Sequence, residues 1–257
     1  MKPYYSDAWV TLYHGKCEDV LPSLAPVDAV ITDPPYSEHT HNKVRRNFQT
    51  MPDQHPRNFD LGFGALTPDL MRFCAGQFAR LARRWVLTFS DMESDHLWRR
   101  RLKRAGMDYV RTGVWIREAA TPQFSGDRPA AGAEAITIMH PPGRKRWNGG
   151  GSHAVWSYPI VNNVREPRIH TTQKPLPLME RLVDLFTDPG ETILDAFAGS
   201  STTLRAAKNL GRKAVGVEMS EEYCEVSARR LDGQQGNIFG VGEVPVASRP
   251  QQTSIFG

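Results

Sequence analysis

The run Asp33-Pro34-Pro35-Tyr36 places an acid, two prolines and an aromatic ring directly after an apolar segment of strand length. Because proline fixes its own φ and restricts the residue before it, this turn is stiff. It holds the Asp33 carboxylate, the Pro34 carbonyl and the Tyr36 ring in a set relation. The two oxygens can accept both N–H groups of an exocyclic amine while the ring stacks on the attached base. The run therefore predicts an amine-binding site, and a purely structural turn is the alternative.

A second segment, residues 192–203, has the pattern of an apolar strand, a turn of small residues and a helix start. Gly199 and the serines after it allow backbone N–H groups and a helix N-terminus to approach a ligand closely, as at nucleotide sites in doubly wound sheets. The chain contains neither G-x-x-x-x-G-K-[ST] nor G-x-G-x-x-G, which argues against ATP, GTP and dinucleotides as ligands. The turn therefore predicts a site for a nucleoside without a diphosphate.

Asp195 and Glu218 are the acids of this second site. Glu218 ends the next apolar segment, 23 residues after Asp195, and an acid at about this spacing binds the ribose hydroxyls in Rossmann-type folds. S-adenosylmethionine is a nucleoside carrier that lacks a diphosphate, so it fits this pair. The alternative is that both acids simply lie in loops at strand ends.

Seven apolar segments of strand length alternate with five amphipathic segments of helical period. The predicted strands are residues 9–14, 29–32, 85–90, 109–116, 135–140, 192–197 and 214–217. The predicted helices are residues 68–82, 94–105, 176–187, 202–210 and 221–231. This alternation predicts an α/β fold in which helices cover both faces of a sheet, with the two acidic turns at carboxyl ends of strands.

The composition is that of a globular protein, with 40% hydrophobic and 23% charged residues among 257. No window approaches the ~18 apolar residues of a membrane span, and the first residues lack the apolar stretch of a signal peptide. We therefore expect a cytoplasmic protein with no membrane partner. The three cysteines are widely spaced and have no neighbouring histidine, so we expect neither a disulfide framework nor a metal site.

Charge is unevenly distributed along the chain. Residues 43–172 carry 21 Lys and Arg against 11 Asp and Glu, whereas the remainder carries 11 against 17. Arginine outnumbers lysine by 24 to 8, and a guanidinium group can bind a phosphate or a guanine edge with two donors. This distribution suits a nucleic-acid partner, and a solvated basic face is the alternative. The candidate contacts lie in two long loops and are Lys43, Arg45, Arg46, Arg144, Lys145 and Arg146.

Together these motifs resemble the amino-group DNA methyltransferases, which transfer a methyl group from S-adenosylmethionine to adenine N6 or cytosine N4. Residues 33–36 match the catalytic motif of the family, residues 195–202 its cofactor loop, Glu218 its ribose acid and residues 170–175 the segment before the cofactor loop. The catalytic motif precedes the cofactor loop by about 160 residues, which is similar to the circularly permuted order of the beta class. The resemblance implies a Rossmann-like mixed seven-stranded methyltransferase sheet with the catalytic half before the cofactor half.

The resemblance also implies a role for each residue that matches a family motif. The implied catalytic residues are Asp33, Pro34, Pro35 and Tyr36. The residues implied to bind S-adenosylmethionine are Cys17, Glu18, Asp33, Thr172, Gln173, Lys174, Asp195, Phe197, Ala198, Gly199, Ser200, Ser201, Thr202, Glu218 and Met219. Thr172, Gln173 and Lys174 are the implied contacts to the carboxylate of the cofactor. The partner would be double-stranded DNA, and the target base must be flipped out of the duplex, at a cost of roughly a few kcal/mol.

Two positions depart from the family pattern. Ser201 stands where the cofactor loop usually has a second glycine, which is compatible with the loop only if φ is negative there. Lys16 stands where an acid contacts the adenine of the cofactor. We therefore expect either weaker cofactor binding or a substitute acid, Glu18 or Asp19.

The motif order predicts four parts of the chain. Residues 1–140 are expected to form the catalytic half, with a mobile loop at about 37–64, and residues 141–169 a small target-recognition insert. Residues 170–232 are expected to form the cofactor-binding half and residues 233–257 a flexible tail. Because a small insert offers little surface to read bases, we expect a short recognition site or a homodimer.

The choice of target base depends on the first residue of the catalytic motif. Asp33 favours adenine N6, because cytosine N4 enzymes of the family more often have serine at that position. Two alternatives stay open, a cytosine N4 methyltransferase and a catalytically silent DNA-binding homologue.

Overall fold

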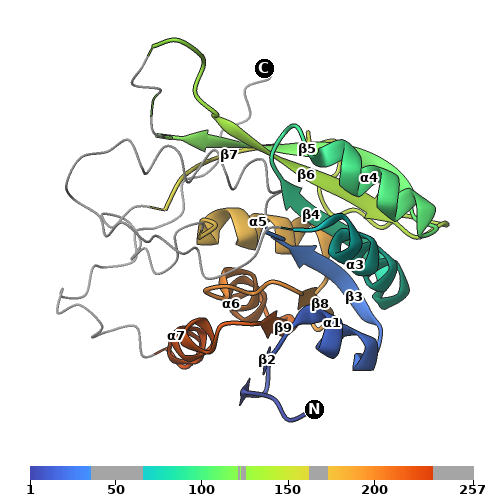
Figure 1. The fold of residues 1–257 in the computed structure, drawn as a ribbon, viewed down its shortest axis with the longest axis vertical. Helices are drawn as coiled ribbons and strands as arrows, with labels where there is room; N and C mark the ends of the chain where they lie inside the picture. The colour runs from blue at the N-terminus through green and yellow to red at the C-terminus, as the bar shows by residue number, and fades with distance from the viewer. Residues whose placement is uncertain (36–65, 121, 123–125, 162–172, 234–257) are drawn as a thin grey trace.

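The computed structural model describes residues 1–35, 66–120, 122, 126–161 and 173–233. These residues form one sheet with the strand order β1-β2-β9-β8-β3-β4-β6-β5-β7 (Figure 1). The strands are β1 (Tyr5–Ser6), β2 (Val10–His14), β3 (Val27–Thr32), β4 (Ala82–Ser90), β5 (Asp108–Glu118), β6 (Ala133–His140), β7 (Val155–Pro159), β8 (Thr192–Asp195) and β9 (Lys213–Glu218). The helices are α1 (Cys17–Val20), the 3-10 turn η1 (Leu21–Ser23), α3 (Pro68–Leu81), α4 (Asp95–Arg104), α5 (Leu176–Phe186), α6 (Thr202–Asn209) and α7 (Glu221–Leu231).

Strand direction determines where the acidic turns lie. Strands β2, β9, β8, β3 and β4 are parallel, so their carboxyl ends meet at one edge of the sheet, here called the carboxyl edge. β6 is antiparallel to β4 and to β5, and β7 is parallel to β5. β5 and β7 therefore also end at the carboxyl edge, whereas β6 ends at the opposite, amino edge. The predicted mixed sheet is confirmed.

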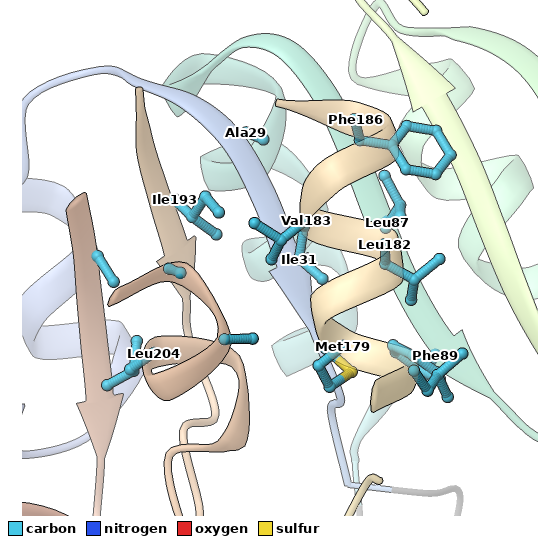
Figure 2. Close-up of a cluster of buried hydrophobic side chains, with 14 of the residues drawn as sticks. Ala29, Ile31, Leu87, Phe89, Met179, Leu182, Val183, Phe186, Ile193 and Leu204 are labelled. Carbon is cyan, nitrogen blue, oxygen red and sulfur yellow. The ribbon is translucent and has the colours of Figure 1, made fainter. Parts of the chain in front are cut away.

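Buried side chains alternate between the two faces of the central strands, as expected for strands covered by helices on both sides. In β3, Ala29 and Ile31 belong to the core under α5, whereas Val30 belongs to the core under α3. Figure 2 shows the first of these cores, in which Met179 and Phe186 of α5 lie against β3 and β4. Helices α5, α6 and α7 cover this face and α1, α3 and α4 cover the other, which gives three layers (Figure 1).

The helices begin where the sequence supplies caps. The Thr67 hydroxyl accepts the N–H of Leu70 at 3.2 Å, and Pro68 occupies the first turn of α3. Ser220 caps α7 in the same way, by accepting the N–H of Tyr223 at 3.4 Å. All five predicted helices are present with ends within one residue of the expected positions.

The sheet has nine strands rather than the expected seven. β1 pairs with β2 at one edge of the sheet and β7 pairs with β5 at the other. β7 lies within residues 141–169, so the expected insert contains a strand of the sheet that the sequence does not predict. Trp156 explains the difference, because this second residue of β7 is buried in contact with Phe186. The predicted strand at 192–197 is also shorter, and β8 ends at Asp195.

Three observations concern the part of the chain that the structure describes. No helix in it is both long and apolar enough to cross a membrane. It contains no group of three or more His, Cys, Asp or Glu residues placed to hold a metal ion. Its cysteines, Cys17, Cys74 and Cys224, are buried and free.

Candidate active site

Neighbouring strand ends at the carboxyl edge bring three predicted acids together. β3 ends just before Asp33, β8 ends at Asp195 and β9 ends at Glu218. β8 lies between β3 and β9 in the sheet, so Asp195 stands between the other two acids. The Thr32 hydroxyl joins two of these ends by donating to Asp195 Oδ1 at 2.7 Å. The sheet thus places the turn that begins at Asp33 beside the turn after β8.

The Asp33 carboxylate is anchored through one oxygen. Its Oδ2 forms an ion pair with Lys174 Nζ, whereas its Oδ1 is buried with no hydrogen-bond partner among the residues of known position. Pro34 and Pro35 follow directly, and Pro34 is buried. A buried oxygen without a donor is costly, and an N–H group of a bound amine would satisfy it. Asp33 is therefore arranged as an acceptor.

Lys174 is a buried cation between two carboxylates. Its Nζ lies 3.3 Å from Glu134 Oε2 as well as beside Asp33, and 7% of its side chain is exposed. The ammonium also lies 5.1 Å from the ring centroid of Phe89 and 6.0 Å from that of Trp115. Glu134 is a site residue that the sequence does not reveal, because nothing in its local pattern distinguishes it from any other glutamate in a strand.

The pKa values of this cluster are shifted by burial and by neighbouring charges. Burial raises the pKa of Asp33 to about 6, against the effect of Lys174 and with a contribution from Glu134. Burial alone would lower the pKa of Lys174, but the two carboxylates outweigh it and raise that pKa above its ordinary value. Lys174 is therefore charged at neutral pH, and Asp33 is mostly ionised there.

The turn after β8 forms one hydrogen-bonded unit with the end of β9. Asp195 Oδ1 accepts the N–H of Phe197 at 3.2 Å. Gly199, whose φ of 51° lies in the left-handed region that favours glycine, donates its N–H to Glu218 Oε2 at 2.8 Å. Ser220 donates its N–H to Glu218 Oε1 at 2.8 Å. The turn and Glu218 therefore hold each other in place.

Glu218 is nearly buried at the predicted ribose position. Burial raises its pKa, although the two backbone N–H groups that it accepts lower it. Each carboxylate oxygen keeps a second lone pair that can accept a hydrogen bond from a hydroxyl group. The next residue, Met219, is 48% exposed, and its carbonyl oxygen lies 3.1 Å from His14 Nε2. The carboxyl end of β9 can therefore receive a ligand that carries hydroxyl groups.

Ser201 adopts a left-handed conformation, with φ of 60° and ψ of 35°. The condition of a negative φ at this position is not met, because the turn closes with an N–H of Ser201 donated to the Ala198 carbonyl at 2.7 Å. The left-handed conformation costs a residue other than glycine roughly 1–2 kcal/mol. In addition, the buried Ser201 hydroxyl has no hydrogen-bond partner within the described ranges. The loop therefore holds Ser201 under strain.

Ser201→Gly is expected to raise the free energy of unfolding by about 1 kcal/mol. The change removes backbone strain and a buried unpaired hydroxyl, and the greater freedom of glycine in the unfolded chain offsets part of the gain. Denaturant unfolding measures the difference. Ser200→Gly is the matched control, because Ser200 has no positive φ and its change should lower stability. If Ser201→Gly also lowered the free energy of unfolding, the inference that Ser201 is strained would be wrong.

Helix α7 supports the turn after β8. Arg230, which is 3% exposed, donates through Nη1 to the Ser200 carbonyl at 2.8 Å and to the Thr202 hydroxyl at 3.0 Å. Ser227 donates to the Gly199 carbonyl at 3.0 Å. The sequence does not predict this role of Arg230, because an arginine in the last turn of an amphipathic helix is usually in solvent.

The turn after β2 gives little support to the predicted contacts of Cys17 and Glu18 with the cofactor. Cys17 faces the core, with its Sγ 3.8 Å from Cys74 Sγ, so its backbone is what it can present to a ligand. Lys16 is exposed. Glu18 and Asp19 are also exposed, and the expectation that one of them replaces the acid missing at position 16 stays a prediction.

The structure does not bring Arg144, Lys145 and Arg146 to the carboxyl edge. Lys145 Nζ pairs with Asp108 at 3.3 Å, at the start of β5, and Arg146 Nε pairs with Asp188 at 3.1 Å, shortly before β8. Both partners lie at the amino edge, where the antiparallel strand β6 ends. The predicted DNA contact of these three residues therefore has no geometric support at the candidate site.

Five of the predicted site residues lie outside the described residues, so their roles stay predictions. They are Tyr36, Lys43, Arg45, Arg46 and Thr172. Gln173, the neighbour of Lys174, is described and is buried.

Sequence comparison matches both acidic turns to one family. The profile of the DNA methylase family for N6 and N4 methyltransferases matches residues 27–229. DNA adenine methyltransferase YhdJ of Escherichia coli (strain K12) is 43% identical over 79 residues, which are 30% of this chain and 27% of that enzyme. The match to YhdJ thus spans about a quarter of its length.

Two solved structures share the fold. The M1.HpyAVI–SAM complex superposes with a TM-score of 0.66 and 23% identity, over 87% of this chain and 99% of that chain. The cytosine-N4-specific PvuII DNA methyltransferase gives a TM-score of 0.70 and 15% identity, over 89% of this chain and 88% of that chain. Because the family profile covers most of the sequence, including Asp33, Asp195 and Glu218, this chain belongs to the family of N6 and N4 DNA methylases.

Proposed function

We propose that this chain transfers a methyl group from S-adenosylmethionine to the N6 amino group of adenine in double-stranded DNA. The single observation that carries the proposal is the buried, unpartnered Oδ1 of Asp33, which lies at the same sheet edge as the turn after β8. An acceptor fixed in this way suits an exocyclic amine. Family membership supplies the reaction class.

The carboxyl edge fits the cofactor. Glu218 has lone pairs for ribose hydroxyls, and the left-handed Gly199 lets the backbone of the turn approach a ligand closely. The residues expected to hold S-adenosylmethionine are those of the turn after β8 together with Glu218, Met219 and Gln173. When bound there, the cofactor supplies an electrophilic methyl group on a sulfonium centre.

Asp33 and Pro34 orient the amine. Asp33 Oδ1 accepts one N–H of the amino group and the Pro34 carbonyl accepts the other, which draws electron density toward the nitrogen and directs its lone pair. Positioning of this kind supplies most of the rate enhancement expected here. Stacking of the flipped base on Tyr36 recovers roughly 1–3 kcal/mol of the cost of extrusion.

Asp33 also supports adenine as the target, because cytosine N4 enzymes more often have serine at this position. Two acceptors suit either amine, and known relatives include an adenine enzyme and a cytosine-N4-specific one. N4 methylation of cytosine is therefore the second candidate.

Nucleoside analysis tests the proposal directly. DNA incubated with the purified protein and S-adenosylmethionine is digested and analysed by mass spectrometry, with DNA incubated without the cofactor as control. We expect N6-methyldeoxyadenosine. N4-methyldeoxycytidine would select the second candidate, and no modified nucleoside together with no cofactor binding by calorimetry would indicate a silent homologue.

Target recognition is proposed for the segments that leave the carboxyl edge after β3, β5 and β7. The predicted contacts Lys43, Arg45 and Arg46 belong to the first of these segments. Residues 141–154 join β6 to β7 at the amino edge and are not included in this proposal.

A further inference from the structure

We propose that Lys174 and Glu134 are positioning residues that fix Asp33 for the amine, and that Lys174 does not bind the carboxylate of the cofactor. This inference rests on the proposed function. The resemblance implies a cofactor contact for Lys174, but its ammonium already lies between two protein carboxylates.

The three charged residues come from three parts of the fold. Asp33 follows β3, Glu134 lies in β6 and Lys174 precedes α5. β4 separates β3 from β6 in the sheet, and Phe89 of β4 lies 5.1 Å below the ammonium, measured from its ring centroid. The ion pairs therefore connect the end of β3 with β6 across β4, over the aromatic ring of Phe89.

The pairing explains how Asp33 presents a single free oxygen. Lys174 occupies Oδ2, so the carboxylate cannot rotate without breaking a buried ion pair, and Oδ1 stays available for a substrate N–H group. Glu134 in turn holds the ammonium from its other side. Loss of Lys174 would leave two buried carboxylates facing each other, which favours protonation of one of them.

The pH dependence of kcat at saturating cofactor tests this arrangement. The charged groups that face Asp33 are Lys174, Glu134 and Asp195. The ionised form of Asp33 is the acceptor, so wild-type kcat should fall as the pH drops through about 6. Lys174→Met should move this acid limb to higher pH, because the cation lowers the pKa of Asp33. Glu134→Gln should move it to lower pH, because Glu134 raises that pKa.

The acid limb of the kcat profile should therefore shift in opposite directions in Lys174→Met and Glu134→Gln. A purely structural role of the two residues would not produce opposite shifts. Lys174→Met should also lower kcat by about 10²-fold with an unchanged Kd for S-adenosylmethionine in calorimetry, since small misplacement of a reacting group has such effects. The double variant Lys174→Met/Glu134→Gln removes one charge of each sign, so its acid limb should return toward that of the wild type.

Two outcomes would overturn the inference. A raised Kd for the cofactor with unchanged kcat in Lys174→Met would make Lys174 a cofactor ligand. An acid limb that stays in place in both single variants would leave only a structural role. If Lys174→Met does not fold by circular dichroism, the nearly isosteric Glu134→Gln carries the test alone. Absence of methylation by the wild type would refute the proposed function instead.

A second inference arises from the basic face of α4, on the side of the sheet covered by α3 (Figure 1). We propose that this face binds the phosphate backbone of DNA without sequence preference. Helix α4 has ten residues, five of them basic: Arg99, Arg100, Arg101, Lys103 and Arg104. No ion pair joins any of them to a carboxylate within the described part of the chain.

The charges on α4 repel one another, and Asp69 offsets this repulsion only in part at Arg101. Burial lowers the pKa of Arg101, and the neighbouring Arg100, Arg72 and Arg104 lower it further. Nη1 of Arg101 is buried and has no hydrogen-bond partner among residues that the structure places. Phosphate groups would relieve this repulsion and supply acceptors. α4 runs from the carboxyl edge toward the amino edge, so it suits DNA that extends beyond the target base.

Salt dependence of DNA binding tests this second inference. The double variant Arg100→Gln/Arg104→Gln should reduce the slope of log Kd against log salt by about 0.9 for each lost phosphate contact on long DNA. Methylation of a duplex that only covers the recognition site should be unchanged. Arg229→Gln/Lys213→Gln, which removes the same charge elsewhere, should leave the slope unaltered. The inference would be overturned by an unchanged slope in the α4 variant or by an equal reduction of the slope in the control variant. It would also be overturned if the slope changed for RNA but not for DNA.

Discussion

Asp33→Ala is expected to reduce methyl transfer by about 10³-fold or more while cofactor binding is retained. The change removes the carboxylate oxygen that is proposed to accept one N–H of the amine, and transition-state contacts of this kind carry effects of this size. The protein should still fold, because Lys174 and Glu134 remain as a neutral buried pair. Tritium transfer to DNA measures turnover, and calorimetry measures the Kd for S-adenosylmethionine.

Asp69→Ala is the matched control, because Asp69 is an exposed acid on α3 whose ion pair is with Arg72 of the same helix and not with Lys174. It should methylate like the wild type. If Asp33→Ala methylated DNA at a rate near that of the control, methyl transfer to the amine would not depend on Asp33.

Glu218→Ala is expected to weaken S-adenosylmethionine binding by about 10–10²-fold. One hydrogen bond to a charged group contributes roughly 1.5–3 kcal/mol, and about 1.4 kcal/mol corresponds to a tenfold change in Kd. The substitution also leaves the N–H groups of Gly199 and Ser220 without their acceptor, so the turn loses its fixed shape. Glu218→Gln keeps one oxygen and should have a smaller effect.

The control for this prediction is Glu221→Ala, which removes an exposed acid in the first turn of the same helix that Glu218 precedes. Its Kd should equal that of the wild type. Cofactor binding to Glu218→Ala with the affinity of the control would contradict a ribose contact.

The sequence predicts the sheet and its five main helices because local patterns determine them. Alternation such as Ala29, Val30 and Ile31 reflects two covered faces, and caps such as Thr67 and Ser220 determine where helices begin. The acidic turns are predictable for the same reason, since each follows an apolar strand directly. Their meeting at one edge then follows from parallel strand direction.

The far side of the sheet could not be predicted in this way. β6 is antiparallel to its neighbours, and nearly all of its residues are buried, so no local feature gives its direction. The insert that was expected to recognise the target, residues 141–169, therefore starts at the amino edge, with Arg146 bound to Asp188. β7 depends on the packing of Trp156, which is a tertiary contact.

Three site features are likewise tertiary. Glu134 and Arg230 gain their roles from residues distant in sequence, Lys174 and Ser200 respectively. The left-handed Ser201 is the reverse case, because its residue type argues against a conformation that the surrounding turn imposes. Residue type predicts the backbone conformation well where only local preferences act. It predicts the conformation poorly where contacts of the surrounding turn impose it.

The contact between α7 and the turn after β8 also has a consequence for the timing of biosynthesis. A chain grows from its N-terminus, so the turn leaves the ribosome before Ser227 and Arg230 do. Until those residues emerge and α7 docks, nothing secures the carbonyl groups of Gly199 and Ser200. A nascent chain therefore contains its Asp33 turn early in translation, but it is expected to become competent to hold a nucleoside only after residue 230 has been added.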